Sequence, residues 1–245
     1  MGKNKLAKFE EIKTFDNVIQ IPSYSLDKED FHLKGKWAES YFKNGNPVVL
    51  EIGCGKGEYT LALAERNPHK NYIGVDIKGA RIWRGAKTAL GRGMKNVVFV
   101  RFNVEIINHV FGVSEIEEIW ITFPDPQMKK IKKRLTSASF MKQYRDILIK
   151  GGVVNLKTDS DFQYLYTLNL ARLNGFEIVA ETDNIYGSDS VNEALQIKTY
   201  YEKQWLSRGI PIKYIAFRFN NTDLKEPEIF LKRDDYRSFG RSARS

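Results

Sequence analysis

Asp125 stands between two prolines, Pro124 and Pro126, directly after an apolar run at 119–123. Proline fixes its own φ and restricts the residue before it, so this carboxylate is expected on a stiff loop that follows a strand. Five cations follow within six residues: Lys129, Lys130, Lys132, Lys133 and Arg134. A charge run is often only a solvated face and the turn only a rigid turn, but together they favour a strip that binds phosphates beside an acidic site.

A glycine-rich loop is the second candidate ligand site. The run 48–52 is apolar apart from Glu51, and Gly53, Gly55 and Gly57 follow it at alternate positions. Glycine lets the backbone turn sharply after a strand and approach a ligand closely. A tight turn without a ligand is the alternative. We favour a ligand loop in which Glu51 bonds a polar or cationic group.

Polar residues also end three other strand-like runs. Asp76 comes 25 positions after Glu51, where an acid can accept hydrogen bonds from both hydroxyls of a ribose. Asn103 ends the third run, where it could meet an adenine edge, and Asp159 ends the fifth. The carboxyl ends of parallel strands share one edge of a sheet, so these residues are expected near Asp125. The alternative for Asp76 and Asp159 is a helix N-cap.

Two further features bear on the chemistry. Thr199 and Glu202 belong to a late helix-like segment, and their T-x-x-E spacing is also that of a capping box. Cys54, the only cysteine, has no histidine beside it in the sequence, which disfavours a nucleophilic role. A single cysteine allows no internal disulfide and favours a reducing cytoplasm. The three histidines show no ligand spacing, so no metal is expected.

Length and charge limit the classes of protein. The 245 residues are 42% apolar and 28% charged, which suits one α/β domain with a sizeable core. Lys and Arg number 39 against 30 acids, a net charge of +9 that favours a polyanionic partner such as nucleic acid. No apolar run is long enough to span a bilayer, and the start of the chain shows no signal sequence.

Strand and helix signals alternate from Pro47 onward, which predicts βαβ units and a mostly parallel sheet. The predicted strands are 48–52, 72–76, 97–102, 118–123, 152–158, 176–181 and 212–219, and the predicted helices are 58–66, 78–91, 139–149, 161–173 and 194–208. We expect an N-terminal extension at 1–46 whose first dozen residues form a mobile arm, a single domain at 47–220, and a polar tail at 221–245 with a disordered end at 241–245.

The motifs in their order resemble the bacterial tRNA (guanine-N7)-methyltransferases, which are class I S-adenosylmethionine (SAM) enzymes. The likeness covers 48–219 and is carried by the glycine loop, Phe-Pro-Asp-Pro at 123–126, the basic run, Lys-Thr-Asp at 157–159 and Thr-x-x-Glu at 199–202. It implies a Rossmann-like fold with a seven-stranded, mostly parallel sheet, an antiparallel last strand and helices on both faces. It also implies methylation of N7 of the tRNA variable-loop guanosine, position forty-six.

The resemblance implies roles for particular residues. It places SAM against Glu51, Gly53, Gly55, Asp76, Asn103 and Asp125, and the target nucleotide against Lys129, Asp159, Thr199 and Glu202. Asp125 matches the family's proposed catalytic acid. The family usually reads Pro-Trp-Pro-Lys after that acid, whereas this chain has Pro126, Gln127 and Met128 and a loop about two residues shorter.

The chemistry is consistent with these residues, and alternatives stay open. Guanine N7 carries a lone pair and no proton at neutral pH, so the protein needs to position the reactants rather than supply a strong base. Rival interpretations are a SAM enzyme for another RNA site or a small molecule, a non-catalytic RNA-binding module and an NAD oxidoreductase. The last is disfavoured because the third glycine comes one residue early for G-x-G-x-x-G. Monomer and homodimer are equally compatible with the sequence.

Overall fold

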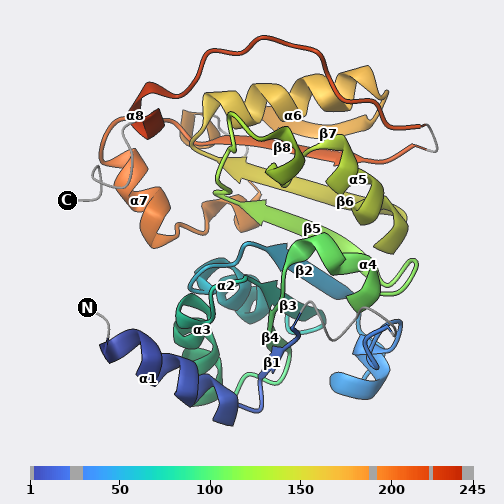
Figure 1. Ribbon diagram of the computed structural model, residues 1–245, viewed down its shortest axis with the longest axis vertical. Coiled ribbons are helices and arrows are strands. Elements are labelled where there is room, and N and C mark those ends of the chain that lie inside the picture. Colours follow the sequence, from blue (N-terminus) through green and yellow to red (C-terminus); the bar gives the residue numbers. More distant parts are fainter. Residues whose placement is uncertain (1–2, 23–29, 188–191, 221–222, 239–245) are drawn as a thin grey trace.

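Eight strands form one sheet in the part of the chain that the computed structural model describes, residues 3–22, 30–187, 192–220 and 223–238. The strand order is β1-β4-β3-β2-β5-β6-β8-β7. The pairs from β1 to β6 are parallel, and only β8 runs antiparallel to its two neighbours, β6 and β7 (Figure 1). The predicted Rossmann-like fold with an antiparallel last strand is therefore confirmed, with one additional edge strand.

The elements have the following bounds. The strands are β1 Val18–Gln20, β2 Val48–Ile52, β3 Asn71–Val75, β4 Val97–Arg101, β5 Ile116–Thr122, β6 Leu148–Thr158, β7 Glu177–Thr182 and β8 Lys213–Arg218. The α-helices are α1 Lys3–Glu11, α2 Glu58–Arg66, α3 Gly79–Gly91, α4 Ile107–Val110, α5 Ala138–Ile147, α6 Asp161–Leu173, α7 Tyr200–Leu206 and α8 Asp235–Ser238. Short 3-10 helices include η5 Ile131–Lys133, η6 Ile185–Gly187 and η7 Glu193–Gln196, and Trp37–Tyr41 forms a π-helical turn, η3.

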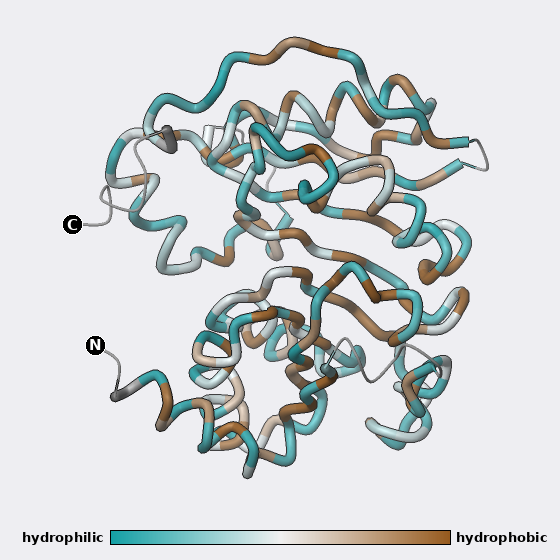
Figure 2. Tube along the Cα trace, in the orientation of Figure 1, coloured by the Kyte–Doolittle hydropathy of each residue, from teal (hydrophilic) through white to brown (hydrophobic). Residues whose placement is uncertain are grey.

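Helices cover both faces of the sheet, so its central strands are buried along their whole length and mostly apolar (Figure 2). All five residues of β2 and of β3 are buried. One face packs against α4, α5 and α6, and the other packs against α2, α3, η6 and residues 194–197. The residues at the carboxyl ends of the parallel strands are the ones left at the rim of this core. None of the helices in the described ranges is long and apolar enough to cross a membrane.

The predicted helix at 194–208 is wrong as a single element. Residues 193–196 form η7, Thr199 has an extended backbone, and α7 begins only at Tyr200. The cause is a buried lysine, Lys157, whose Nζ lies 2.8 Å from the carbonyl oxygens of Leu195 and Ile197. Carbonyls used in this way are not available to a continuous helix. The helix predicted at 139–149 also ends early, because β6 begins at Leu148 and bulges at Gly151, where φ is +80°.

The N-terminal extension is part of the folded unit. Its first described residues form α1, which packs on α3, and the mobility of this arm stays a prediction. Ile12 is fully buried, and Glu11 accepts a hydrogen bond from Trp83 Nε1 at 2.7 Å. The short strand β1 then extends the sheet beside β4. Its three half-buried residues give too short a pattern to be recognised in the sequence.

The C-terminal tail crosses over α6 and returns towards the carboxyl edge of the sheet (Figure 1). Leu224 is buried, and the carboxylate of Asp234 accepts a hydrogen bond from the backbone N–H of Phe162 at 3.1 Å at the start of α6. The tail was expected to be a polar appendage, but residues 223–238 are docked on the domain. The disordered end predicted at 241–245 lies outside the described residues.

Candidate functional site

The glycine loop lies between β2 and α2, and Glu51 lies directly beneath it. Gly53, Gly55 and Gly57 all have positive φ, at 77°, 57° and 71°, which explains the alternating glycines. Position 57 also has no room for a side chain, because a Cβ at Gly57 would lie 2.5 Å from the ring of Phe99. The sequence therefore buries this loop between β4 and α3 and leaves its first half open at the rim of the sheet.

Glu51 is buried and serves as a polar anchor for the site. Its carboxylate accepts hydrogen bonds from the Thr60 backbone N–H at 2.8 Å, from the Thr60 hydroxyl, and from the Thr122 hydroxyl at 2.6 Å. Burial raises the pKa of Glu51 to about 7, against the lowering effect of these hydrogen bonds. Burial likewise raises the pKa of the neighbouring Cys54 thiol, which keeps the thiol protonated and unreactive.

Asp76 connects the glycine loop to the next helix. One carboxylate oxygen accepts a hydrogen bond from the Gly55 N–H at 3.0 Å and the other from the Lys78 N–H at 2.7 Å. The residue that caps α3 is Lys78, not Asp76, so the N-cap alternative does not hold for Asp76. The carboxylate keeps lone pairs free, and Asp76 lines a cavity at the carboxyl ends of β2, β3 and β4.

Two cavities meet at Gly53. The larger, of about 320 Å³, is mainly apolar, with Asp76 and Asn103 on its wall and Leu135 and Phe140 opposite. The smaller, of about 80 Å³, is lined by Glu51, the glycine loop, Phe123, Thr199 and Tyr201. An apolar slot joined to a small polar cavity fits a ligand with a flat apolar part and a short charged part.

Asp125 lies on a strained loop after β5. Two positions before and after it, Phe123 and Gln127 have φ of +49° and +46°, conformations that are unusual for residues with a side chain. The Asp125 carboxylate is exposed and accepts a hydrogen bond from the Gln127 N–H at 3.1 Å. The Phe123 N–H bonds the Lys157 carbonyl at 2.8 Å, which fixes the loop to β6. Asp125 thus lies on a loop that follows a strand, as expected, and its carboxylate faces solvent.

Arg134 is not part of an exposed strip, so its prediction as a phosphate contact is wrong for this structure. The side chain is only 2% exposed. Its Nε donates to the Pro126 carbonyl at 3.0 Å and an Nη donates to the Gln127 carbonyl at 3.2 Å. The guanidinium stacks 3.9 Å from the ring centroid of Tyr166. Arg134 therefore clamps the loop that carries Asp125.

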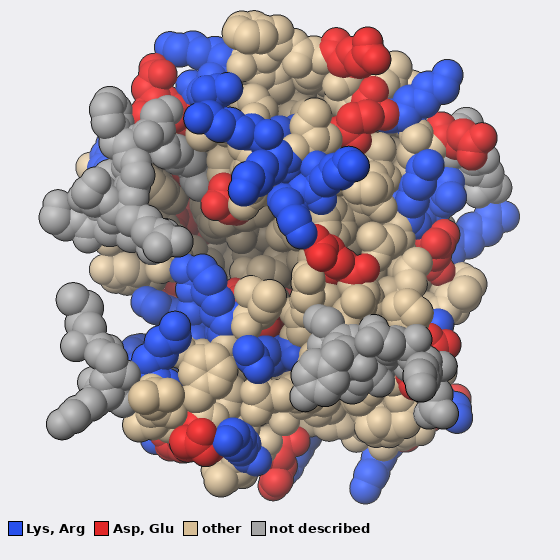
Figure 3. Space-filling model, viewed as in Figure 1, with Lys and Arg blue, Asp and Glu red and all other residues tan. Residues whose placement is uncertain are grey.

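The other four cations of the run are exposed. Lys129, Lys130 and Lys132 reach solvent, whereas Lys133 forms an ion pair with Glu105 beside the larger cavity. On the face shown in Figure 3, Lys and Arg side chains gather on both sides of a hollow near the middle of the molecule. Among the described residues, three of these exposed cations, Lys129, Lys130 and Lys132, thus have no ion pair, and they form the exposed strip.

Asp159 lies at the expected edge of the sheet but is completely buried. The hydroxyl of Tyr236, from the C-terminal segment, donates to its carboxylate at 2.9 Å and to its carbonyl at 3.0 Å. Asp159 is therefore not open to a nucleotide in this structure. The covering residue was not predicted, because Tyr236 is 77 positions away in the sequence.

Thr199 and Glu202 form the capping box that their spacing allowed. Glu202 is fully buried, and its carboxylate pairs with the equally buried Nζ of Lys157 at 2.8 Å. Burial lowers the pKa of Lys157 to about 8, and Glu202 opposes that shift. A direct substrate contact predicted for Glu202 is wrong for this structure, because a buried ammonium requires its carboxylate. Thr199, by contrast, lines the smaller cavity.

Known proteins resemble this chain over its whole length. A family model described as putative methyltransferase matches residues 45–215. A tRNA (guanine-N(7)-)-methyltransferase of Bacteroides fragilis is 51% identical over 100% of this chain and 98% of its own length. The enzyme of the same name from Christiangramia forsetii is 52% identical over 89% of this chain and 98% of its own length. The chain belongs to the tRNA (guanine-N7)-methyltransferase family.

Solved structures agree with this family on the fold. The 16S rRNA methyltransferase KamB superposes with a TM-score of 0.57 at 13% identity, covering 73% of this chain and 90% of that one. At this identity the likeness concerns the fold alone. This member of the tRNA (guanine-N7)-methyltransferase family thus has the class I methyltransferase sheet, with the glycine loop and Asp125 at one rim.

Sequence reasoning missed several residues of the site in this tRNA (guanine-N7)-methyltransferase family member. Thr60 and Thr122 complete the hydrogen bonding of Glu51, and Tyr201 lines the smaller cavity. Thr122 could have been noticed, because it is the one polar residue in the apolar run before Asp125. No local pattern marks Thr60, which becomes relevant only when α2 folds over the end of β2.

Proposed function

We propose that this protein transfers a methyl group from SAM to N7 of a guanosine in tRNA, the variable-loop guanosine at position forty-six, giving 7-methylguanosine. The observation that carries the proposal is its identity of about half, over the full length, to proteins named for this reaction. Asp125, exposed and two residues after Phe123 on the wall of the smaller cavity, supports it.

The residues of the two cavities fit SAM. The apolar slot suits the adenosine, with Asp76 accepting from the ribose hydroxyls and Asn103 facing the adenine edge. Glu51, with Gly53 and Gly55, lines the small polar cavity and would hold the cationic amino-acid end. SAM supplies a methyl group activated by a sulfonium. Ionised Glu51 also gains a favourable partner there, since its charge is costly when buried alone.

The chain's own residues then have to position guanine and balance charge. The Asp125 carboxylate can accept hydrogen bonds from guanine N1–H and the exocyclic amine, which adenine does not offer together. It also offsets the positive charge that develops on the methylated ring. Lys129 and Thr199 lie where they could contact the nucleotide, while Glu202 supports Thr199 through the capping box and the Lys157 pair.

Direct chemistry tests the reaction and its position together. The protein is incubated with SAM and unmodified tRNA, and the product is treated with borohydride and aniline, which cut the chain at 7-methylguanosine. Cleavage at one variable-loop guanosine is the expected result. Methyl label incorporated elsewhere in the tRNA, or none incorporated at all, would contradict the proposal.

The exposed strip gives a prediction about tRNA binding. The double variant Lys130→Glu, Lys132→Glu is expected to weaken tRNA binding by roughly tenfold or more and to flatten its salt dependence, because each lost phosphate contact lowers the slope of log K against log salt by ~0.7–0.9. Filter binding across a salt series measures both, and calorimetry should show unchanged SAM affinity. A wild-type slope in the variant would exclude the strip as a phosphate contact.

Substitution of Arg134 is expected to lower kcat and to leave the salt dependence of tRNA binding unchanged. Arg134→Lys keeps the charge but cannot bond the carbonyls of Pro126 and Gln127 with one planar fork. We expect kcat for tRNA methylation to fall by roughly tenfold, since a misplacement of about 1 Å can cost far more, while the salt slope of tRNA binding stays as in wild type. Normal kcat together with a normal melting temperature would show that the guanidinium does not position the Asp125 loop. A melting curve of the variant checks that it is folded.

A further inference from the structure

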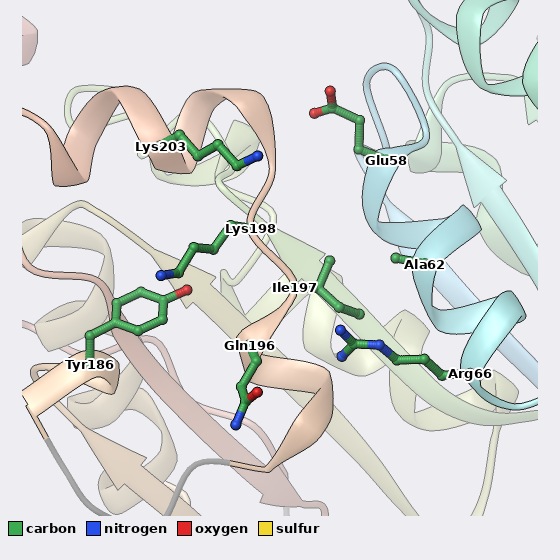
Figure 4. Close-up of a pocket in the computed structure, with 8 residues that line it drawn as sticks. All are labelled: Glu58, Ala62, Arg66, Tyr186, Gln196, Ile197, Lys198 and Lys203. Atoms are coloured by element: carbon green, nitrogen blue, oxygen red, sulfur yellow. The ribbon is translucent and has the colours of Figure 1, made fainter.

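A second, larger groove lies next to the proposed methyl-transfer site. It has a volume of about 640 Å³ and separates α2 from η6, η7 and the start of α7. Figure 4 shows Arg66 extending from α2 towards the opposite segment and Lys203 extending from α7 towards α2. None of the sequence motifs pointed to this groove.

The groove is lined by three cations and one acid. Arg66, Lys198 and Lys203 are exposed, and none of them has a carboxylate within 4.0 Å among the residues that the structure describes. Lys198 lies 4.3 Å from the ring centroid of Tyr186. The acid, Glu58, already accepts a hydrogen bond from the Tyr200 N–H at 2.9 Å. Positive charge in the groove is therefore not balanced from within the described chain.

The groove is continuous with the methyl-transfer site. Glu58 lines both the groove and the small polar cavity that contains Glu51 and the glycine loop. Tyr200, bonded to Glu58, directly follows Thr199, which lines the same small cavity. An RNA strand with one nucleotide bound at the rim near Asp125 would therefore be able to continue into the groove.

We propose that this groove binds the phosphate backbone of the substrate tRNA next to the target guanosine. The inference rests on the proposed function. Unbalanced cations attract a polyanion, and the charged donors of Arg66, Lys198 and Lys203 pair with phosphate oxygens irrespective of the base sequence. The contact is thus independent of sequence and holds the strand while the nucleotide at the rim is selected.

The test removes the three charges together. The variant Arg66→Gln, Lys198→Gln, Lys203→Gln is expected to bind unmodified tRNA roughly tenfold to a hundredfold more weakly at about 100 mM salt, with a slope of log K against log salt smaller by ~2. SAM affinity, measured by calorimetry, should not change. The matched control is Lys142→Gln, Lys150→Gln, Lys225→Gln. It removes the same charge from exposed side chains that line neither the groove nor the two cavities of the candidate site. The control should keep the wild-type slope.

The possible outcomes distinguish a failure of the groove proposal from a failure of the proposed methylation reaction. A groove variant that retains the wild-type slope, in a protein that methylates tRNA, overturns the groove and leaves the reaction standing. An equal loss of slope in the groove and control variants also overturns it, because the effect would then be one of net charge. If the wild type binds tRNA through the groove but aniline cleavage detects no 7-methylguanosine, the groove is supported and the proposed reaction fails.

Discussion

Asp125→Asn is expected to lower kcat for guanosine methylation in tRNA by roughly a hundredfold or more, the scale seen when a group aimed at developing charge is removed. Among the residues that the structure describes, the exposed carboxylate accepts one hydrogen bond, from the Gln127 N–H. Its remaining lone pairs can take both guanine donors at once. An amide loses one acceptor, presents a donor to a donor, and carries no negative charge to balance the methylated ring.

Transfer of labelled methyl to tRNA, with the product analysed base by base, measures both rate and selectivity for guanine. Asp223→Asn is a matched control, because it removes an exposed acid from the C-terminal segment outside both cavities. Turnover and guanine selectivity of Asp125→Asn equal to those of the control would show that the carboxylate takes no part in the reaction.

Glu51→Gln is expected to move stability and cofactor affinity in opposite directions. The carboxyl has a pKa of about 7 in the folded protein against an ordinary 4.5. Between these values the folded protein binds more protons than the unfolded chain, so the free energy of unfolding falls as pH rises through this window. Above it, the ionised group costs roughly 3 kcal/mol, from ~1.4 kcal/mol per pKa unit. Glutamine removes that cost, since its amide can reproduce the bonds to Thr60 and Thr122.

Thermal melting of the ligand-free proteins at pH 5 and pH 8 tests the first half. The wild type should lose stability between the two pH values and Glu51→Gln should lose less. Calorimetry at pH 8 tests the second half, with SAM affinity of the variant expected to be about tenfold lower, the scale of one lost hydrogen bond to a charged group. Glu118→Gln removes another raised-pKa acid, on β5 and outside both cavities, and should leave SAM affinity unchanged. A variant that is destabilised at pH 8, or that binds SAM normally, would refute the role of Glu51.

The sequence was most informative where the physical cause is local. The apolar runs of the central strands, the positive φ of Gly53 and Gly55, and the stiff acid at Asp125 all follow from neighbouring residues. These features were enough to predict the sheet and the rim at which the candidate site lies.

Pairings between distant residues were beyond such reasoning. Arg134 looks like any other cation of its run until Pro126 and Gln127 fold back over it. Lys157 and Glu202 are 45 positions apart, yet their pairing removes Glu202 from the solvent. Such buried contacts depend on which segments the fold brings together, and neither spacing nor composition encodes that locally.

Proteolytic cleavage of the C-terminal segment would affect the candidate site. Between its anchors at Glu226 and Asp234, the chain exposes Phe230 almost fully, at 98%. A protease that prefers aromatic residues would meet a bare peptide there. A single cut there would separate from the domain the part of the chain that carries Asp234, bound at the start of α6, and Tyr236, which covers Asp159, although Phe230 lines neither cavity of the candidate site.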